Sequence, residues 1–218
     1  MLNILFVLLH RSSRMSRMNI FINNLFFANM KTLKFKITGT RPLMLNNPRT
    51  VNPFDEYSKL LKPLTSKRTK TEDDLIEISR LKFIASLYVD ENGYFLPQEC
   101  IERSIIEAAK ERKLGKKFER SFNVIDRAPL DFKDNKKKPE QLFDMGNMYV
   151  DVRAVGIKNA RITTTRAIIP NWSATFECWY DETQLDEKEV LDVLEIAGLR
   201  YGVGTYRRLY GRFSVKKI

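Results

Sequence analysis

The chain has 218 residues, which is enough for one domain with a sizeable core but cramped for two independent domains. Its 38 Lys and Arg residues outnumber its 27 Asp and Glu residues, and a net charge of +11 favours a polyanionic partner. The sequence contains one histidine, His10, and two cysteines, Cys100 and Cys178. This composition argues against a zinc site and against a nucleophile activated by histidine. We therefore expect two buried thiols, no metal and no cofactor.

Residues 1–29 differ in character from the rest of the chain. Residues 2–9 are apolar but fall short of the roughly 20 residues that span a bilayer, and basic residues follow them rather than precede them as in a signal peptide. We interpret 1–29 as a disordered leader or the product of a start codon assigned too far upstream, because organised patterning begins after Met30. An interfacial helix holding Phe21, Leu25 and Phe26 is the alternative, and otherwise we expect no stable membrane association.

The first half of the chain predicts one strand followed mainly by helices. Residues 32–38 alternate apolar and polar side chains, which indicates a strand with one buried face. Thr71 precedes three acidic residues and an apolar stripe, which predicts a helix over 71–88. The other predicted elements are a loop over 39–52, a short helix over 54–61 that Pro63 ends, a hairpin turning at 90–93, and a helix over 97–113.

The second half predicts an irregular segment followed by strands. Residues 116–145 show no period and many basic residues, so we expect a long, partly mobile basic insertion. Regular patterns then predict strands over 149–156, 160–169 and 173–180, a helix over 186–197 that Gly198 ends, and a final strand over 212–216.

This order of elements predicts the fold class. Strand, helix, strand pair, helix and strand match the α+β, ferredoxin-like (RRM-like) arrangement, an antiparallel sheet with helices on one face. We expect a single domain over 30–218 with basic insertions around 41–70 and 115–148. The helices over 71–88 and 97–113 would both occupy the first crossover.

A glycine- and arginine-rich segment, residues 198–215, is the most informative part of the sequence. Within it lie four glycines, four arginines and three tyrosines. Glycine allows the backbone to approach a ligand, arginine binds phosphate, and a tyrosine ring can stack on a base. The segment indicates a nucleic-acid contact, with a solvated helix stop and turn as the alternative.

Three short motifs carry a family resemblance. Gly202-Val-Gly204 and Tyr210-Gly-Arg-Phe213 follow a helix and enter the last strand, and Gly39-Thr-Arg-Pro42 follows the first strand. Together they resemble the glycine-rich loop of the repeat-associated RNA-binding (RAMP) superfamily, which includes the Cas7-type backbone subunits of CRISPR complexes. The chain is also similar to small Cas7-like proteins of phages and prophages. The resemblance implies a ferredoxin-like core that grips nucleic acid, assembly as a homo-oligomer or filament, and a cytoplasmic location, in the bacterial host if the protein is encoded by a phage.

We assign candidate nucleic-acid-binding residues on two grounds. The resemblance implies loop glycines and basic contacts at Gly202, Gly204, Gly211, Arg207, Arg208 and Arg212. The residue types themselves add Tyr206 and Tyr210 in the same segment, Arg153, Arg161 and Arg166 in the central strands, and Arg41 and Arg49 in the first loop. The strand arginines could equally protect a sheet edge.

The predicted function is non-catalytic binding of RNA or single-stranded DNA through this loop and a basic surface. One alternative is a phage structural or assembly protein whose basic loops make subunit contacts. The other is a magnesium-dependent nuclease using acids such as Asp131, Asp134 or Asp151. The densest acidic group, residues 72–74, is explained by its place at a helix start, so we expect no catalytic residue and no metal site.

Overall fold

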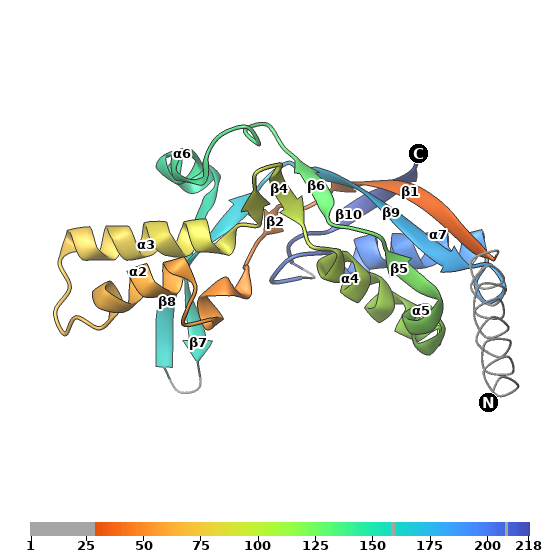
Figure 1. Ribbon diagram of the computed structural model, residues 1–218, viewed down its shortest axis with the longest axis horizontal. Coiled ribbons are helices and arrows are strands. Elements are labelled where there is room, and N and C mark those ends of the chain that lie inside the picture. The colour runs from red at the N-terminus through yellow and green to blue at the C-terminus, as the bar shows by residue number, and fades with distance from the viewer. Residues whose placement is uncertain (1–28, 158–159, 208) are drawn as a thin grey trace, which may run out of the picture.

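The computed structural model describes residues 29–157, 160–207 and 209–218 (Figure 1). Residues 1–28 of the leader predicted over 1–29 lie outside this description, as do the side chains of 157, 160 and 161. The described residues form two antiparallel sheets with helices, which confirms the α+β class.

The larger sheet has seven strands. Six of them lie side by side in the order β10-β1-β9-β6-β4-β3, and β5 pairs with another part of β9. The helices α4, α5 and α7 lie on one side of this sheet, and the ferredoxin-like order β1, α4, β5/β6, β9, α7, β10 can be followed in Figure 1. The strand bounds are Met30–Gly39 (β1), Val89–Asp90 (β3), Gly93–Leu96 (β4), Phe122–Val124 (β5), Ala128–Asp131 (β6), Ser173–Asp181 (β9) and Phe213–Lys217 (β10). The helix bounds are Gln98–Glu111 (α4), Gly115–Ser121 (α5) and Glu187–Ile196 (α7).

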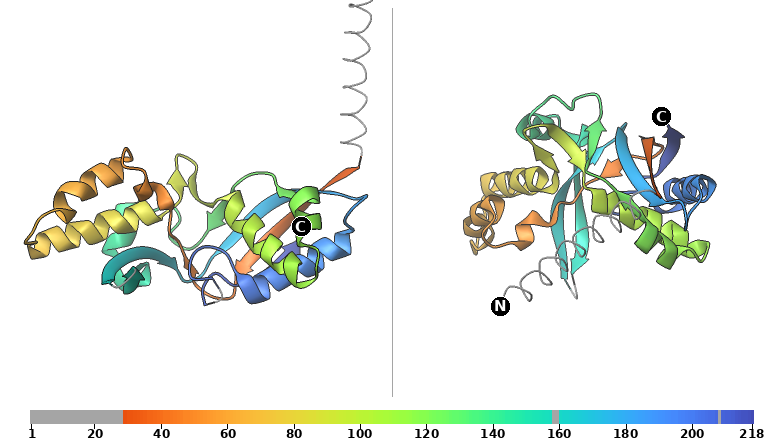
Figure 2. Two further views of the ribbon diagram at one scale, coloured as in Figure 1. Left: turned by 90° about the horizontal axis from the view of Figure 1, so that it is seen from below. Right: turned by 45° about the vertical axis from the view of Figure 1, so that its right-hand side comes forward.

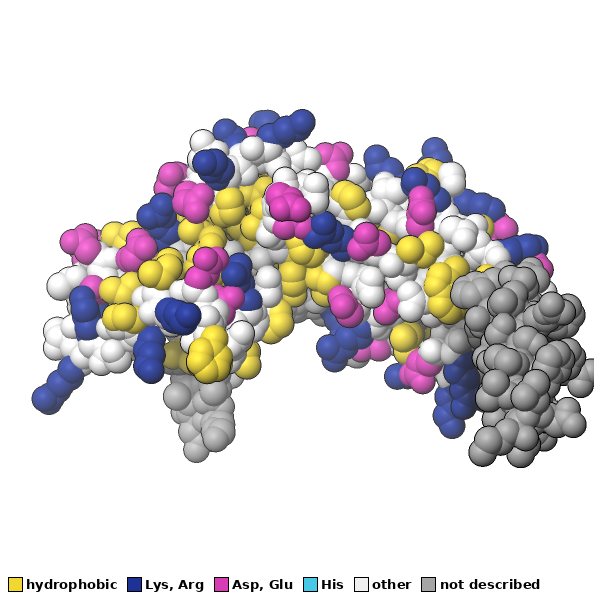
Figure 3. Space-filling view, in the orientation of Figure 1, with side chains coloured by type: hydrophobic (Ala, Val, Ile, Leu, Met, Phe, Trp, Pro, Cys, Tyr) yellow, Lys and Arg dark blue, Asp and Glu magenta, His cyan; other side chains and the backbone are white. Residues whose placement is uncertain are grey.

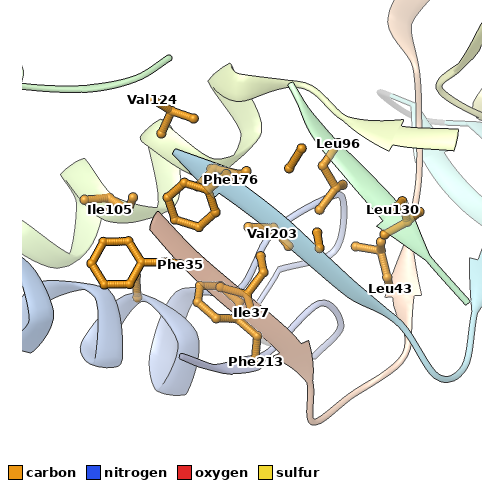
Figure 4. Close-up of a cluster of buried hydrophobic side chains, with 14 of the residues drawn as sticks. Phe35, Ile37, Leu43, Leu96, Ile105, Val124, Leu130, Phe176, Val203 and Phe213 are labelled. Atoms are coloured by element: carbon orange, nitrogen blue, oxygen red, sulfur yellow. The ribbon is translucent and has the colours of Figure 1, made fainter. Parts of the chain in front are cut away.

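Alternation along β1 builds the core beneath this sheet. Leu33, Phe35 and Ile37 are buried while the lysines between them are exposed, as the sequence predicted. Phe35 packs on Phe176 with ring centroids 5.8 Å apart. Figure 4 shows Phe35, Ile37 and Phe176 near Val203, which follows α7 and is fully buried. The glycine-rich segment is therefore anchored in the core.

The smaller sheet belongs to a second lobe. Its order is β2-β8-β7, and β7 and β8 form a long antiparallel hairpin. Helix α3 packs on β8, where the hydroxyls of Ser79 and Thr165 lie 2.8 Å apart. Figure 2 shows that the α2–α3 pair lies well apart from α4, α5 and α7. The bounds here are Leu43–Met44 (β2), Val150–Ile157 (β7), Ala160–Ile169 (β8), Glu56–Thr65 (α2), Glu72–Ser86 (α3), Pro139–Asp144 (α6), and the 3-10 turns Pro48–Val51 (η1) and Gly146–Met148 (η2).

Two assignments within the predicted fold were wrong. The segment 116–145 is regular rather than irregular, because β5 and β6 lie in it and pair with β9. Strands of three and four residues are too short to show a period, so only their pairing reveals them. The helix over 71–88 lies between β1 and β3 in the chain, but it packs on β8 of the smaller sheet rather than on the larger sheet. An apolar stripe indicates that a helix is buried but not which sheet covers it.

Two helix ends also differ from expectation. Pro63 lies inside α2, which continues to Thr65, so the hydrogen bond that proline cannot donate is lost only near the helix end. Gly198 does not end the helical segment that begins with α7. The chain continues from α7 into a π-helix, Ala197–Tyr201 (η3), and Gly202, with φ +70°, ends the helical segment. Gly198 instead allows the backbone of Phe213 to approach closely.

No described helix has the length and apolar character needed to cross a membrane.

The stability contributed by Asp74 should be lost in acid. Its carboxylate accepts hydrogen bonds from Lys67 Nζ at 2.6 Å and from the backbone N–H of Thr71 at 3.0 Å. The bond from Lys67, and then that from Thr71, lowers the pKa of Asp74. The pKa of Asp74 is lower in the folded protein than in the unfolded chain, where it is about 3.9. Asp74 therefore stabilises the fold fully above the unfolded pKa, and this stabilisation disappears as the pH falls through the folded pKa. We expect Asp74→Asn to be less stable than the wild type at neutral pH, with the difference shrinking below about pH 4.

Urea unfolding at several pH values measures this difference. Asp73→Asn is the matched control, because Asp73 is exposed on the same turn and should change stability little. A constant difference between wild type and Asp74→Asn at all pH values would contradict the assignment.

Candidate nucleic-acid interface

The C-terminal loop, defined here as residues 202–212, has a conformation that only glycine permits at three positions. Gly202, Gly204 and Gly211 have φ of +70°, +80° and +68°. A Cβ on Gly204 would lie 2.5 Å from the carbonyl oxygen of Met44, and one on Gly211 would overlap that of Val203. These glycines therefore shape the loop, whatever it binds.

Backbone hydrogen bonds hold the C-terminal loop against the segment after β1. The N–H of Thr205 donates to the carbonyl of Met44 at 2.8 Å, and that of Gly211 donates to Pro42 at 2.7 Å. The N–H of Val203 donates to Gly211 across the loop at 2.9 Å. The three motifs that carried the family resemblance are thus joined by direct hydrogen bonds.

The loop brings two tyrosines against two arginines of the β7–β8 hairpin. The guanidinium carbon of Arg153 lies 5.0 Å from the ring centroid of Tyr206 and 5.2 Å from that of Tyr210. The guanidinium carbon of Arg166 lies 5.1 Å from the ring centroid of Tyr206. These are cation–π distances. We call Arg153, Arg166, Tyr206 and Tyr210 the arginine–tyrosine cluster.

The strand register explains why both arginines reach the loop. Asp151 pairs with Arg166 across the hairpin, and directly paired residues share one face of a sheet. Arg153 lies two residues beyond Asp151 and shares that face as well. Both arginines therefore face the side of the hairpin that the loop approaches.

The two arginines differ in electrostatic state. Arg153 donates to both carboxylate oxygens of Asp151 at 2.5 Å and to the hydroxyl of Tyr210 at 3.0 Å. The hydrogen bonds to Asp151, and to a smaller extent the one to Tyr210, raise the pKa of Arg153 above its ordinary value. Arg166 donates through Nε to the side-chain oxygen of Asn46 at 3.1 Å and, among the described residues, pairs with no carboxylate. Arg166 therefore keeps a positive charge that a ligand can neutralise.

Tyr206 presents its ring at a conformational cost. Its φ is +50°, and a residue with a Cβ in the left-handed region costs about 1–2 kcal/mol. It is 37 % exposed, and its neighbour Leu209 is 64 % exposed. Backbone strain of this kind often accompanies functional sites.

Other candidate residues do not join the cluster. Arg49 bonds to Asp55 at 2.9 Å and to Glu56 at 3.2 Å at the start of α2, and stacks on Tyr57. Arg207 pairs with Glu107 of α4 at 3.1 Å and so ties the loop to the protein. Arg41 and Arg212 line a separate pocket. Arg208 and the side chain of Arg161 lie outside the described residues.

Sequence reasoning overlooked the acidic partners of these arginines. Asp151 was considered only as a possible acid, and Glu107 was not considered at all. The spacing Asp151-Val-Arg153 was a usable signal, because residues two apart on a strand lie on one face. Glu107 and Arg207 are 100 residues apart, and no local pattern could pair them.

The acids considered for metal-dependent catalysis have other partners. Asp131 accepts from Asn135 at 3.0 Å, Asp134 accepts from the hydroxyl of Tyr149 at 2.7 Å, and Asp151 binds Arg153. Across the described ranges, no three His, Cys, Asp or Glu side chains gather closely enough to hold a metal ion.

Net charge alone does not locate an interface. On the face in Figure 3, Lys and Arg side chains are interspersed with Asp and Glu rather than gathered into one stripe. The arginine–tyrosine cluster is distinguished by its geometry.

Comparison with known proteins supports the fold. No protein-family model matches the sequence, and no similar sequence is found among curated proteins. One protein chain in the cryo-EM structure of the Type III-B Cmr-beta bound to cognate target RNA aligns with a TM-score of 0.51 at 14% identity. The two share a fold. The alignment covers 94% of this chain but only 66% of that one.

A second alignment, to Cmr6 from Pyrococcus furiosus, has a TM-score of 0.41 at 10% identity and covers 87% of this chain and 99% of Cmr6. That score is too low to carry an argument. The first similarity is a likeness of fold, and it agrees with the α+β class expected from the sequence.

Proposed function

We propose that this protein binds single-stranded RNA, without cutting it, through the arginine–tyrosine cluster. The observation that carries the proposal is the stacking of Arg153 and Arg166 against Tyr206, with Arg166 free of any carboxylate among the described residues. Proteins that bind single strands combine basic side chains, which contact phosphates, with aromatic rings, on which bases stack. This cluster supplies both.

The fold similarity supports RNA as the partner. The protein with which the chain shares a fold comes from an assembly bound to target RNA. Single-stranded DNA presents the same phosphates and bases, so it is the natural competitor in any binding measurement. Side-by-side assembly of several copies along one strand is part of the proposal.

A role in subunit contacts is the second candidate, and a specific observation favours it. A groove between α3 and the β7–β8 hairpin is lined by apolar side chains that are about half exposed: Leu75, Ile76, Val152 and Ile162. Exposed apolar patches commonly mark protein interfaces. Strong self-association without RNA binding would favour this role over the first.

Replacing Arg166 should test the cluster directly. We expect Arg166→Ala to weaken binding of a fluorescent single-stranded RNA and to reduce the slope of log affinity against log salt by about 0.7, the value for one lost phosphate contact to a single strand. Salt titrations of the full chain by fluorescence anisotropy measure both quantities.

Arg120→Ala is the matched control. Arg120 is exposed on α5, so the variant loses the same charge away from the cluster. If both variants changed affinity and slope equally, diffuse charge rather than the cluster would account for binding.

A further inference from the structure

A second basic feature lies at the base of the C-terminal loop, on the side of α7. There the start of β10 and the end of α7 border an open pocket of about 500 Å³. Arg41 and Arg212 both line it. Neither arginine belongs to the arginine–tyrosine cluster, and the pocket shares no lining residue with the groove along α3.

One donor of the Arg212 guanidinium has no acceptor among the described residues. Its Nε is buried and, within the described ranges, has no hydrogen-bond partner. A buried donor without an acceptor is destabilising, and the penalty is larger for a charged group. Because Nε is closed off from solvent, a ligand in the pocket would meet the rest of the Arg212 side chain, whose terminal N–H groups are donors suited to an oxyanion.

The backbone places Arg41 beside Arg212. The N–H groups of Thr40 and Arg41 both donate to the carbonyl of Arg212, at 2.8 and 3.3 Å. Arg41 is exposed and forms no ion pair with any described residue. Two guanidinium groups thus line one pocket with no carboxylate bound to either, although they normally bind carboxylates or phosphates.

The remaining lining residues complete the chemistry. Thr40 and Ser214 provide hydroxyls, and Leu199, 66 % exposed, provides an apolar wall. The carboxylate of Glu195 also lines the pocket and is exposed. Two arginines against one glutamate leave the pocket with a net positive charge.

We propose that this pocket binds a phosphate group through Arg41 and Arg212. Where the phosphate belongs to RNA, the inference rests on the proposed function and extends the binding path beyond the cluster. Tyr210 and Arg212 are two residues apart, so their Cα atoms are at most about 7–8 Å from each other. One strand can therefore contact Tyr210 and place a phosphate in the pocket, while a small phosphate compound can occupy the pocket alone.

Pyrophosphate binding tests the pocket independently of RNA. Isothermal titration of the full-length protein with pyrophosphate should show binding that Arg41→Ala weakens at least tenfold. Arg120→Ala, the control from the RNA experiment, should leave it unchanged, and Glu195→Gln should strengthen it by removing the opposing charge. Arg212→Lys keeps the charge but removes the fork of donors, and it should weaken binding as well.

The same variants in the RNA salt titration separate the two proposals. Pyrophosphate binding that depends on Arg41 would support the pocket even if the wild type bound no RNA, in which case the proposed function alone would fail. RNA binding that Arg166→Ala reduces and Arg41→Ala does not, together with no effect of Arg41→Ala on pyrophosphate, would overturn the pocket and leave the proposed function intact.

Discussion

Tyr206→Ala should weaken binding of single-stranded RNA by about 5- to 150-fold, the equivalent of the 1–3 kcal/mol that a stacked base contributes. Tyr206 is the residue of the cluster that both arginines contact, and part of its surface is open to solvent. Removing the ring removes the stacking surface and the cation–π contacts of Arg153 and Arg166, while their hydrogen bonds to other residues remain. Fluorescence anisotropy with single-stranded RNA at fixed salt measures the loss.

Two further substitutions at this position show which property of Tyr206 matters. Tyr206→Phe should bind RNA like the wild type, because the Tyr206 hydroxyl has no hydrogen-bond partner within the described part of the chain. Tyr206→Gly should match Tyr206→Ala in affinity but be about 1 kcal/mol more stable, because glycine accepts φ +50° without strain. Unchanged affinity in Tyr206→Ala would remove the ring from the interface.

Gly211→Ala should destabilise the protein by about 2–5 kcal/mol, which combines left-handed strain with overpacking. Gly211 has φ +68°, and a Cβ there would overlap the carbonyl of Val203. The contact is with backbone, which cannot rotate away as a side chain can. The substitution should also break the hydrogen bonds from Gly211 to Pro42 and from Val203 to Gly211, and with them the geometry of the loop. Urea unfolding measures the change in the free energy of unfolding.

Gly146→Ala is the matched control for this substitution. Gly146 has a similar φ of +60°, but nothing lies within 4 Å of the position a Cβ would take. It should therefore show the cost of left-handed strain alone, about 1 kcal/mol. Equal destabilisation by both substitutions would mean that the loop opens to accommodate a Cβ at Gly211.

The sequence was informative wherever one short segment contains the whole signal. Alternation in 32–38 predicted β1, Thr71 with its acidic first turn predicted α3, and Asn92-Gly93 predicted the turn between β3 and β4. The signal that marked the C-terminal loop as a candidate site was also local, because its glycine, arginine and tyrosine residues lie close together in the sequence.

Tertiary contacts decided which of the candidate residues meet. Arg153 and Tyr210 are 57 residues apart, and Arg207 and Glu107 are 100 apart. Arg153 lies in the arginine–tyrosine cluster, whereas Arg207 forms an ion pair with Glu107. Nothing in the local sequence distinguishes these two environments.

The strands and helices with a clear period and the α+β class followed from the sequence alone, and the role of residues 198–215 in binding stays a prediction. The three-dimensional fold was needed to see that β5 and β6, rather than β7 and β8, complete the larger sheet, and that β7 and β8 carry Arg153 and Arg166 to Tyr206. The physical reason is that periodicity records whether a side chain is buried, whereas strand pairing and cation–π contacts depend on a partner far away in the chain.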